Sequence, residues 1–482
     1  MTASAPAWPS MSYHSLPIPA AVFELLAYLI VGAAAVLAFV TGWLSINAAV
    51  VITVLLLSYL IVLSWVRLGH GRHPVFLFLC TMMLFQGGRL IGYCLGAEPT
   101  PMRIILLGTN FDIPRYQQGI TLCCVAIASI CAYLPARWSY REVVLPVSPS
   151  VQRYLPYLYL VFACSWPAQF FKSYKYYEYV MAHGGYLALF LNHGAVTATV
   201  PFLVRAMSLV PFPVFITIFV LERRQRFLWV STILYMTSTV VMLALGSRGA
   251  IVTLLFTLWW VTRIKTRKLP SIVILAALTT GLLFVGDFVR QVRAESSGFG
   301  AKFGPIRAIT TEGAPLNMTE MAVKYRDHFN RYSSTYLLYE LTSGFVGLDN
   351  LHYRPGQSLD LDASALLNPT LLNQGNRVAS SYLGEAYIAG GIAAVVLVSL
   401  TIGVALSFVY NRCDHPAFAV LLALTLQDFL IMPRAQLLDW LTVLARNLLM
   451  LTIVWTGWMI YSFITSIRNI RDVSHRGSTL PE

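Results

Sequence analysis

The chain has 482 residues, of which 57% are hydrophobic and 11% charged, and its formal net charge is +13. An average soluble domain contains about 25% charged residues, so this composition excludes a soluble enzyme. In a membrane protein, the positive charge predicts loop orientation rather than nucleic-acid binding. The seven cysteines form no C-x-x-C pair and have no histidines at metal-ligand spacing, so they indicate neither a disulfide framework nor a zinc site.

Apolar runs recur along the whole chain, each near the roughly 20 residues that a membrane-spanning helix needs. The sequence therefore predicts an all-α polytopic membrane protein with about 12 transmembrane helices. The predicted spans cover residues 20–43, 46–66, 74–95, 118–135, 154–170, 196–221, 228–246, 249–262, 271–289, 382–410, 416–433 and 438–463.

Most Lys and Arg residues of the short connections fall on one side of these spans. The positive-inside rule places that side and both termini in the cytoplasm, and the one long connection outside. The chain then divides into helices one to nine (1–289), a large external loop (290–381), and helices ten to twelve with a cytoplasmic tail (382–482). In the loop, aromatic and aliphatic residues at steps of three or four predict an amphipathic helix from Thr319 to Thr342 that covers the membrane face.

Ionisable residues at or within the spans are the main functional candidates, because each costs at least ~2.5 kcal/mol at the bilayer centre. Arg248 stands at the tip of a tight hairpin between the seventh and eighth spans, and Arg446 lies inside the last span. The others fall at the predicted external ends of spans: Asp287, Arg290, Arg293, Glu385, Arg434 and Asp439.

Several arginines above a membrane favour recognition of a multiply charged anion such as a lipid pyrophosphate, since guanidinium groups match phosphate oxygens. The carboxylates Glu385, Asp439 and Asp287 are candidate general bases, with pairing to the arginines as the alternative. His328, on the predicted loop helix, is either an acid/base or sugar-contacting residue or part of a solvated polar face.

Three short stretches and their order resemble the bacterial Wzy-type polymerases of oligosaccharide repeat units. The stretches are Leu245-Gly246-Ser247-Arg248-Gly249-Ala250 between two spans, Ser380-Ser381-Tyr382-Leu383-Gly384-Glu385 before a glycine-rich span, and Pro433-Arg434 followed by Leu438-Asp439-Trp440. The architecture of many spans with one large external loop before the last three agrees with this family.

The resemblance implies a membrane glycosyltransferase of the C type that needs no metal and no cofactor. The growing glycan would leave one undecaprenyl-pyrophosphate carrier and join a sugar hydroxyl of a repeat unit on a second carrier. The implied location is the bacterial inner membrane with the active site facing the periplasm. The implied partners are undecaprenyl-pyrophosphate-linked glycans, membrane lipids and a chain-length regulator, without nucleic acid.

Site roles follow from the resemblance residue by residue. Arg248, Arg290, Arg293 and Arg434 would bind pyrophosphate, and Glu385 would act as base or position the acceptor, with Asp439 and His328 as further catalytic candidates. The expected glycan and lid contacts are Arg326, Arg331, Arg377 and Tyr382.

Two alternatives to a polymerase stay open. O-antigen ligases of the same superfamily carry a histidine before the tenth span, where this chain has Asn373, Gln374, Asn376 and Arg377, which favours a polymerase. A flippase or transporter of lipid-linked oligosaccharide would need no large loop on one face, and its charges would gather near the midplane.

Overall fold

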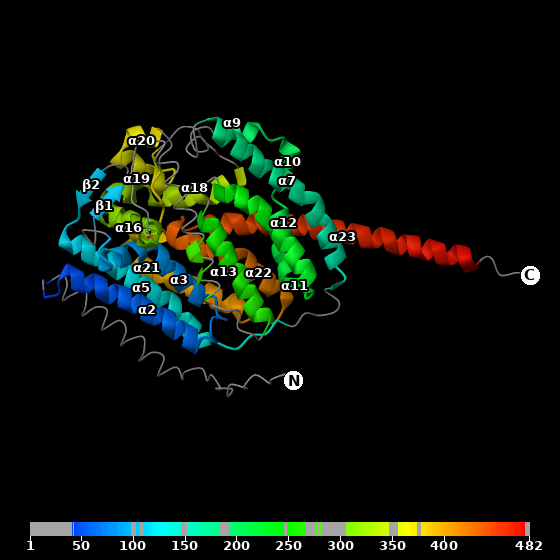
Figure 1. The fold of residues 1–482 in the computed structure, drawn as a ribbon, viewed down its shortest axis with the longest axis horizontal. Coiled ribbons are helices and arrows are strands. Elements are labelled where there is room, and N and C mark those ends of the chain that lie inside the picture. Colours follow the sequence, from blue (N-terminus) through cyan, green and yellow to red (C-terminus); the bar gives the residue numbers. More distant parts are fainter. Residues whose placement is uncertain are drawn as a thin grey trace, which may run out of the picture.

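The computed structural model describes residues 41, 43–97, 103–106, 109–145, 152–183, 193–244, 248–266, 273, 276–277, 279–281, 305–346, 355–373 and 377–477. These residues are helical apart from turns and one antiparallel hairpin of β1 (Arg103–Leu106) and β2 (Thr109–Asp112), in which Arg103 pairs with Asp112 (Figure 1). The helical class predicted from the sequence is therefore confirmed, with this hairpin as a small addition.

The first half of the chain consists mainly of long helices, with three short ones among them. They are α2 (Ile46–Arg67), α3 (Val75–Phe85), α4 (Gly88–Cys94), α5 (Arg115–Ser139), α7 (Leu155–Ala182), α9 (His193–Ala198), α10 (Phe202–Met207), α11 (Pro211–Leu221), α12 (Gln225–Ala244) and α13 (Arg248–Lys265).

The second half begins with short helices and ends with long ones. They are α15 (Pro305–Glu312), α16 (Pro315–Lys324), α17 (Arg326–Phe329), the 3-10 helix η1 (Asn330–Tyr332), α18 (Ser333–Val346), α19 (Leu359–Leu367), α20 (Pro369–Asn373), α21 (Tyr382–Tyr410), α22 (Pro416–Ile431), the 3-10 helix η2 (Met432–Arg434) and α23 (Asp439–Gly477).

Within these residues, seven helices are long and apolar enough to cross a membrane, or eight if the bent pair α3 and α4 counts as one span. The predicted span 382–410 coincides with α21, and 46–66 and 416–433 differ from the observed helices by one residue. The predicted span 74–95 is bent by 56° between α3 and α4. Most of the predicted spans 20–43 and 271–289 lies outside the described residues.

The packing centre is formed by α5, which lies between α2 and α21 (Figure 1). Nearly the whole length of α5 is buried, although its composition alone would suit a lipid-facing span. Gly403 of α21 meets α5 so closely that a Cβ atom there would lie 2.5 Å from the carbonyl oxygen of Ala132. The missing side chain is what allows the two backbones to approach.

The first part of α21 is set off by a break at Gly390 and Gly391. Gly391 has φ +65°, a left-handed conformation that a residue without Cβ adopts freely. The guanidinium group of Arg326 lies beside this break and over the Tyr387 ring, 5.5 Å from its centroid. The break therefore lets the Glu385 end of α21 take its own direction against the loop helices.

The single amphipathic helix predicted from Thr319 to Thr342 is wrong. The segment is divided into α16, α17, η1 and α18, with the first break at Tyr325, whose φ and ψ are −114° and 30°. Met321, Phe329 and Tyr336 all enter one apolar cluster with Leu359 and Ala363 of α19. A straight helix would spread these three side chains over about 22 Å, so the breaks are what bring them together.

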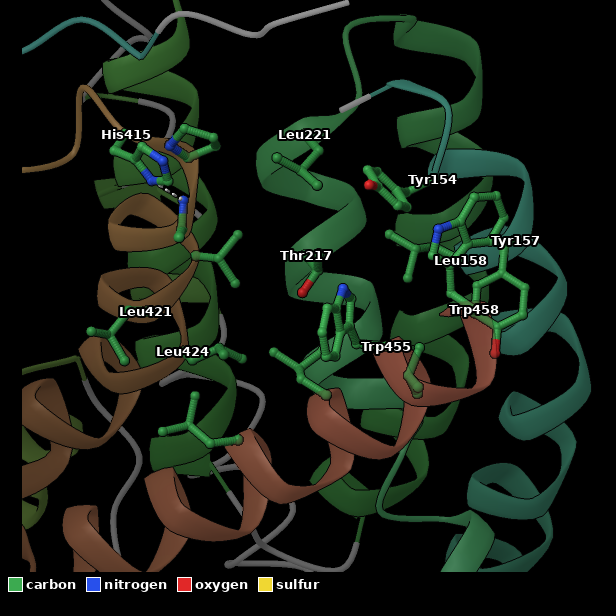
Figure 2. A pocket seen from close by; sticks show the side chains of 16 residues that line it. Tyr154, Tyr157, Leu158, Thr217, Leu221, His415, Leu421, Leu424, Trp455 and Trp458 are labelled. Carbon is green, nitrogen blue, oxygen red and sulfur yellow. Dashed lines mark hydrogen bonds between the residues drawn. The ribbon is translucent and has the colours of Figure 1, made fainter. Parts of the chain in front are cut away.

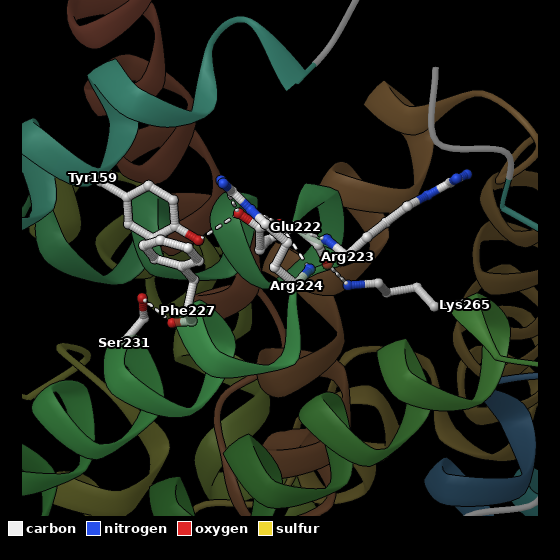
Figure 3. A network of polar contacts seen from close by, with 7 residues as sticks. All are labelled: Tyr159, Glu222, Arg223, Arg224, Phe227, Ser231 and Lys265. Atoms are coloured by element: carbon white, nitrogen blue, oxygen red, sulfur yellow. Dashed lines mark hydrogen bonds and ion pairs between the residues drawn. The ribbon is translucent and has the colours of Figure 1, made fainter. Parts of the chain in front are cut away.

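The turn between α11 and α12 carries a polar network centred on Glu222 (Figure 3). The Glu222 carboxylate accepts backbone N–H bonds from Arg223 and Arg224 at 2.8 Å, and the hydroxyl of Tyr159 donates to it at 2.8 Å. Lys265 of α13 donates to the Phe219 carbonyl at 2.7 Å. This network fixes α7, α11, α12 and α13 to one another at their basic ends.

Gly403→Val should lower the free energy of unfolding by about 2 kcal/mol, because the added side chain meets the α5 backbone, which cannot move aside as a flexible side chain can. The measurement is the apparent melting temperature of the detergent-purified protein. The control is Val404→Leu, since Val404 is 54% exposed on the same helix. Equal melting temperatures for the two variants would contradict the close approach of α5 and α21.

Candidate active site

Three carboxylates from different helices converge on the turn between η2 and α23. The backbone N–H of Leu437 donates to Glu385 of α21 at 2.6 Å, and that of Leu438 donates to Glu340 of α18 at 2.9 Å. The side-chain amide of Gln436 donates to Asp360 of α19 at 3.2 Å. The turn that leads into Asp439 is thus held by acids that are far apart in the sequence.

Glu385 and Glu340 are both buried at this turn. The second oxygen of Glu385 accepts a hydrogen bond from the Ser380 hydroxyl at 2.9 Å, so each of its oxygens has a partner. Burial raises the pKa of Glu340, and the negative charges of Asp439 and Asp360 raise it further. Two adjacent buried carboxyl groups hold a proton between them more readily than two isolated ones.

Asp439 is the first residue of α23 and remains half-buried. Its carboxylate accepts a hydrogen bond from the backbone of Gln436 and faces the charge of Asp360. Unlike Glu385, it therefore combines a fixed position with a partly exposed side chain.

Arg434 stands at the end of η2 and forms an ion pair with Glu312 of α15. Its guanidinium carbon lies 5.8 Å from the centroid of the Phe85 ring. Glu312 is 2% exposed, whereas the side chain of Arg434 is 33% exposed. Because a guanidinium group has five N–H donors, the pair fixes Arg434 and still leaves donors for an anion.

A second buried pair lies beside the first. Arg89 of α4 has Nη1 3.8 Å from a carboxylate oxygen of Glu320 of α16, and Glu320 is fully buried. Neither oxygen of Glu320 has a hydrogen-bond partner in the described part of the chain. Burial raises the pKa of Glu320 to about 7, and the charge of Arg89 offsets part of that rise.

Gln86 ties the surrounding elements together. Its buried side-chain amide donates to the Ser381 hydroxyl at 3.1 Å and to the Pro433 carbonyl at 2.6 Å, and its oxygen accepts from Thr319 at 3.3 Å. The four residues belong to the end of α3, the start of α21, η2 and α16. One buried amide thus fixes the position of Arg434 relative to Glu385.

The structure brings Glu385, Arg434 and Asp439 of the sequence prediction together around one turn. Arg248 is the first residue of α13, and its side chain lies outside the described atoms. The predicted site residues Asp287, Arg290 and Arg293 also lie outside the described residues.

The catalytic candidate His328 is exposed, as are the predicted glycan contacts Arg331 and Arg377. Arg326, a further predicted glycan contact, is half-buried beside the break in α21. The assignment of Tyr382 as a glycan contact is wrong. Its ring is fully buried between Phe78 and the Met82 sulfur, which the hydroxyl approaches to 3.7 Å. As the first residue of α21 it packs inward against α3 and serves the core.

Four acids of this region were not predicted from the sequence: Glu312, Glu320, Glu340 and Asp360. Each lies in the large loop rather than in a span, so the cost of burial in the bilayer gave no reason to single it out. The available signal was local, since Glu320 and Glu340 follow apolar and aromatic residues at helical spacing.

In the described residues no group of three or more His, Cys, Asp or Glu is arranged to hold a metal ion.

The model of the family described as O-antigen polysaccharide polymerase Wzy matches residues 21–467. The chain belongs to this family. Searches of curated proteins and of solved structures returned no match. The protein is therefore a multi-pass membrane enzyme that polymerises lipid-linked repeat units by glycosyl transfer in O-antigen biosynthesis, as its sequence motifs predict.

Glu320 makes the stability of the protein depend on pH. A buried carboxyl with a folded-state pKa of about 7, against an unfolded value of 4.5, binds its proton more tightly in the folded state. Its contribution to stability is therefore complete below pH 4.5 and is lost as the pH rises through 7. The apparent melting temperature should fall less steeply between pH 5 and 8 in Glu320→Gln than in the wild type. Parallel curves for the two proteins would contradict an uncharged Glu320 at the lower pH.

Proposed function

We propose that the turn from Arg434 to Asp439 is the reaction centre and that it faces the periplasm, with both termini in the cytoplasm of a bacterial cell. The single observation that carries this proposal is the convergence of Glu385, two loop carboxylates and a positioned arginine on that turn. The basic residues around Glu222 lie where α11 ends and α12 begins, at the end of the bundle away from the turn of Arg434 to Asp439. By the positive-inside rule, these basic residues support placing that end in the cytoplasm. The described loop segments 305–346 and 355–373 then cover the site from outside.

The substrates that fit this centre are repeat units linked to undecaprenyl pyrophosphate. In the transfer, the bond between the anomeric carbon of the donor glycan and the diphosphate oxygen breaks. A bond forms from that carbon to a hydroxyl oxygen of the acceptor repeat unit, and the hydroxyl proton passes to a base. The diphosphate departs as an anion, so stabilising its charge and removing the proton are the two tasks of the protein.

Arg434 is the residue that we assign to the departing diphosphate. The ion pair with Glu312 and the contact with Phe85 hold its guanidinium group in place while a third of the side chain stays exposed. Preorganised donors of this kind stabilise charge that develops during a reaction. Arg248, Arg290 and Arg293 are proposed as further diphosphate ligands on the strength of the family motifs.

Asp439 is proposed as the base and Glu385 as a positioning residue. Both oxygens of Glu385 are engaged by Ser380 and Leu437, so it acts through the turn that it holds. The half-buried carboxylate of Asp439 lies at the end of that turn. His328, Arg326, Arg331 and Arg377 on the loop side are proposed to contact the glycan.

We further propose that the reaction needs no metal ion. Pyrophosphate is already a good leaving group, and fixed arginines supply positive charge at the place where the negative charge develops. Purified protein incubated with undecaprenyl-pyrophosphate-linked repeat units should give the same product ladder with and without EDTA. Inhibition by EDTA that Mn²⁺ reverses would contradict this proposal.

Asp439→Asn should slow chain extension by about a hundredfold or more, because loss of a general base typically costs that much. The measurement is the initial rate of ladder formation with purified protein and lipid-linked repeat units. The control is Asp414→Asn, which removes an exposed carboxylate paired with Arg141 in the loop between α21 and α22.

Glu385→Gln distinguishes positioning from proton transfer. Its amide can keep an acceptor oxygen for one of the two hydrogen bonds, so we expect a smaller loss of rate than in Asp439→Asn and an unchanged pH dependence of the rate. A Glu385→Gln rate as low as that of Asp439→Asn, with a flattened pH profile, would assign the base to Glu385 instead.

A further inference from the structure

Three cationic side chains outside the site described above lie close to one another. They are Lys172 of α7, Arg205 of α10 and Arg446 of α23, and the Lys172 ammonium interacts electrostatically with both guanidinium groups. All three side chains are half-buried. The Nε atom of Arg205 is buried and has no hydrogen-bond partner among the described residues. We call these three residues the cation cluster.

The neighbours of the cation cluster do not neutralise it. Arg446 interacts electrostatically with the Asp428 carboxylate of α22. Lys172 and Arg205 lie over aromatic rings, at 5.6 Å from the centroid of Tyr176 and 5.9 Å from that of Phe202. None of the three cations forms an ion pair within the described part of the chain. One carboxylate against three cations leaves a positive surplus that a bound anion would offset.

The depth of the cluster in the bundle follows from helix geometry. Arg446 is seven residues beyond Asp439 on α23, about 10 Å along the helix axis from the proposed base. Arg205 is near the start of the span Phe202–Leu221. The cluster therefore lies toward the same end of the bundle as Asp439 and not at the basic end around Glu222.

An apolar cavity of about 580 Å³ extends along the same spans (Figure 2). Its walls come from α7, α11, α22 and α23, and include Tyr157, Leu158, Leu221, Leu424, Leu451 and Trp455. On α23 the cavity wall reaches Leu448, which is two residues beyond Arg446 of the cluster. The helix α7, the span Phe202–Leu221 and the helix α23 each supply one cation to the cluster and part of the cavity wall.

We propose that the cation cluster and this cavity bind the second lipid carrier of the reaction, with its diphosphate at the cluster and its polyprenyl chain in the cavity. This inference rests on the proposed function, in which both substrates are linked to polyprenyl diphosphate. A diphosphate carries a negative charge on each phosphorus and so matches the surplus of the cluster better than the single phosphate of a bulk phospholipid. The cluster lies about 10 Å along α23 from Asp439. This separation suits the acceptor carrier, because the saccharide lies between the reacting hydroxyl of the acceptor and its diphosphate.

The test is binding of undecaprenyl diphosphate to the purified full-length protein in nanodiscs, measured by native mass spectrometry. The wild type should bind a donor and an acceptor carrier, and the double variant Lys172→Gln with Arg446→Gln should lose one of them, with at least about a hundredfold weaker affinity. The charge-conserving variant Lys172→Arg should keep both. The matched control is Lys175→Gln, because Lys175 is one turn along α7 and already pairs with Glu178 at 2.7 Å.

The cavity is tested separately with Leu451→Trp, which fills it from α23 without touching the cations. This variant should weaken binding of undecaprenyl diphosphate and leave binding of the short geranyl diphosphate unchanged. Full occupancy by both carriers in the double variant would overturn the inference, as would phosphatidylglycerol displacing the second carrier at equal concentration. Both readouts are binding, so they are independent of ladder formation, whose absence in the wild type would instead count against the proposed function.

Discussion

The hydrogen bonds of Gln86 are the interaction on which the candidate active site depends. This amide lies at the end of α3, is fully buried, and joins the start of α21 to η2 and to the loop helix α16. A buried amide that loses its partners costs about 1–3 kcal/mol per unmade bond, so the arrangement is a strong constraint on how these elements meet. Because Pro433 is one of the partners, the constraint reaches directly to Arg434, and through Ser381 it reaches the first turn of α21 that carries Glu385.

Charge pairing explains why the loop helices pack onto the membrane helices rather than standing away from them. Arg89 and Arg434 are attached to spans, while Glu320 and Glu312 belong to the loop. Burying one member of such a pair alone is costly, so each arginine draws its loop helix to the bundle. The same pairing leaves Arg434 partly exposed and rigid, which is what a ligand for a departing diphosphate requires. A structural role and a functional role are thus compatible in one residue.

The sequence was sufficient for the features that depend on local composition. The bounds of α21, the position of Asp439 as the first residue of α23 and the short connection before Arg248 all follow from apolar runs and their polar breaks. The same reasoning failed at Tyr325, where three side chains have to reach one cluster and the helix breaks to allow it. The assignment of Tyr382 as a glycan contact came from the family resemblance, and an aromatic residue at the end of a span gives no local sign that it belongs to the core.

Contacts between residues that are distant in the sequence could not be predicted from the sequence, for a physical reason. The hydrogen bond from Leu438 to Glu340 joins residues 98 positions apart, and no periodic pattern relates them. The cation cluster is a similar case. The sequence places Arg205 within a predicted span, but no local pattern shows that Lys172 interacts electrostatically with both Arg205 and Arg446.

The spacing of charged residues along α23 suggests how far apart the two lipid carriers would bind. Transfer between two lipid carriers requires one diphosphate at the reacting carbon and the other at the far end of the acceptor saccharide. Arg434 and Asp439 are separated only by a short turn, so a diphosphate bound by Arg434 would lie beside the proposed base. Arg446 is two helical turns farther along, about 10 Å away, in a bundle region with its own apolar cavity. A single rigid helix that carries both the base and a ligand of the acceptor would fix the distance between bond formation and the acceptor carrier. Such a fixed distance holds the acceptor hydroxyl ready for attack, which is how positioning lowers the barrier of a reaction between two bound substrates.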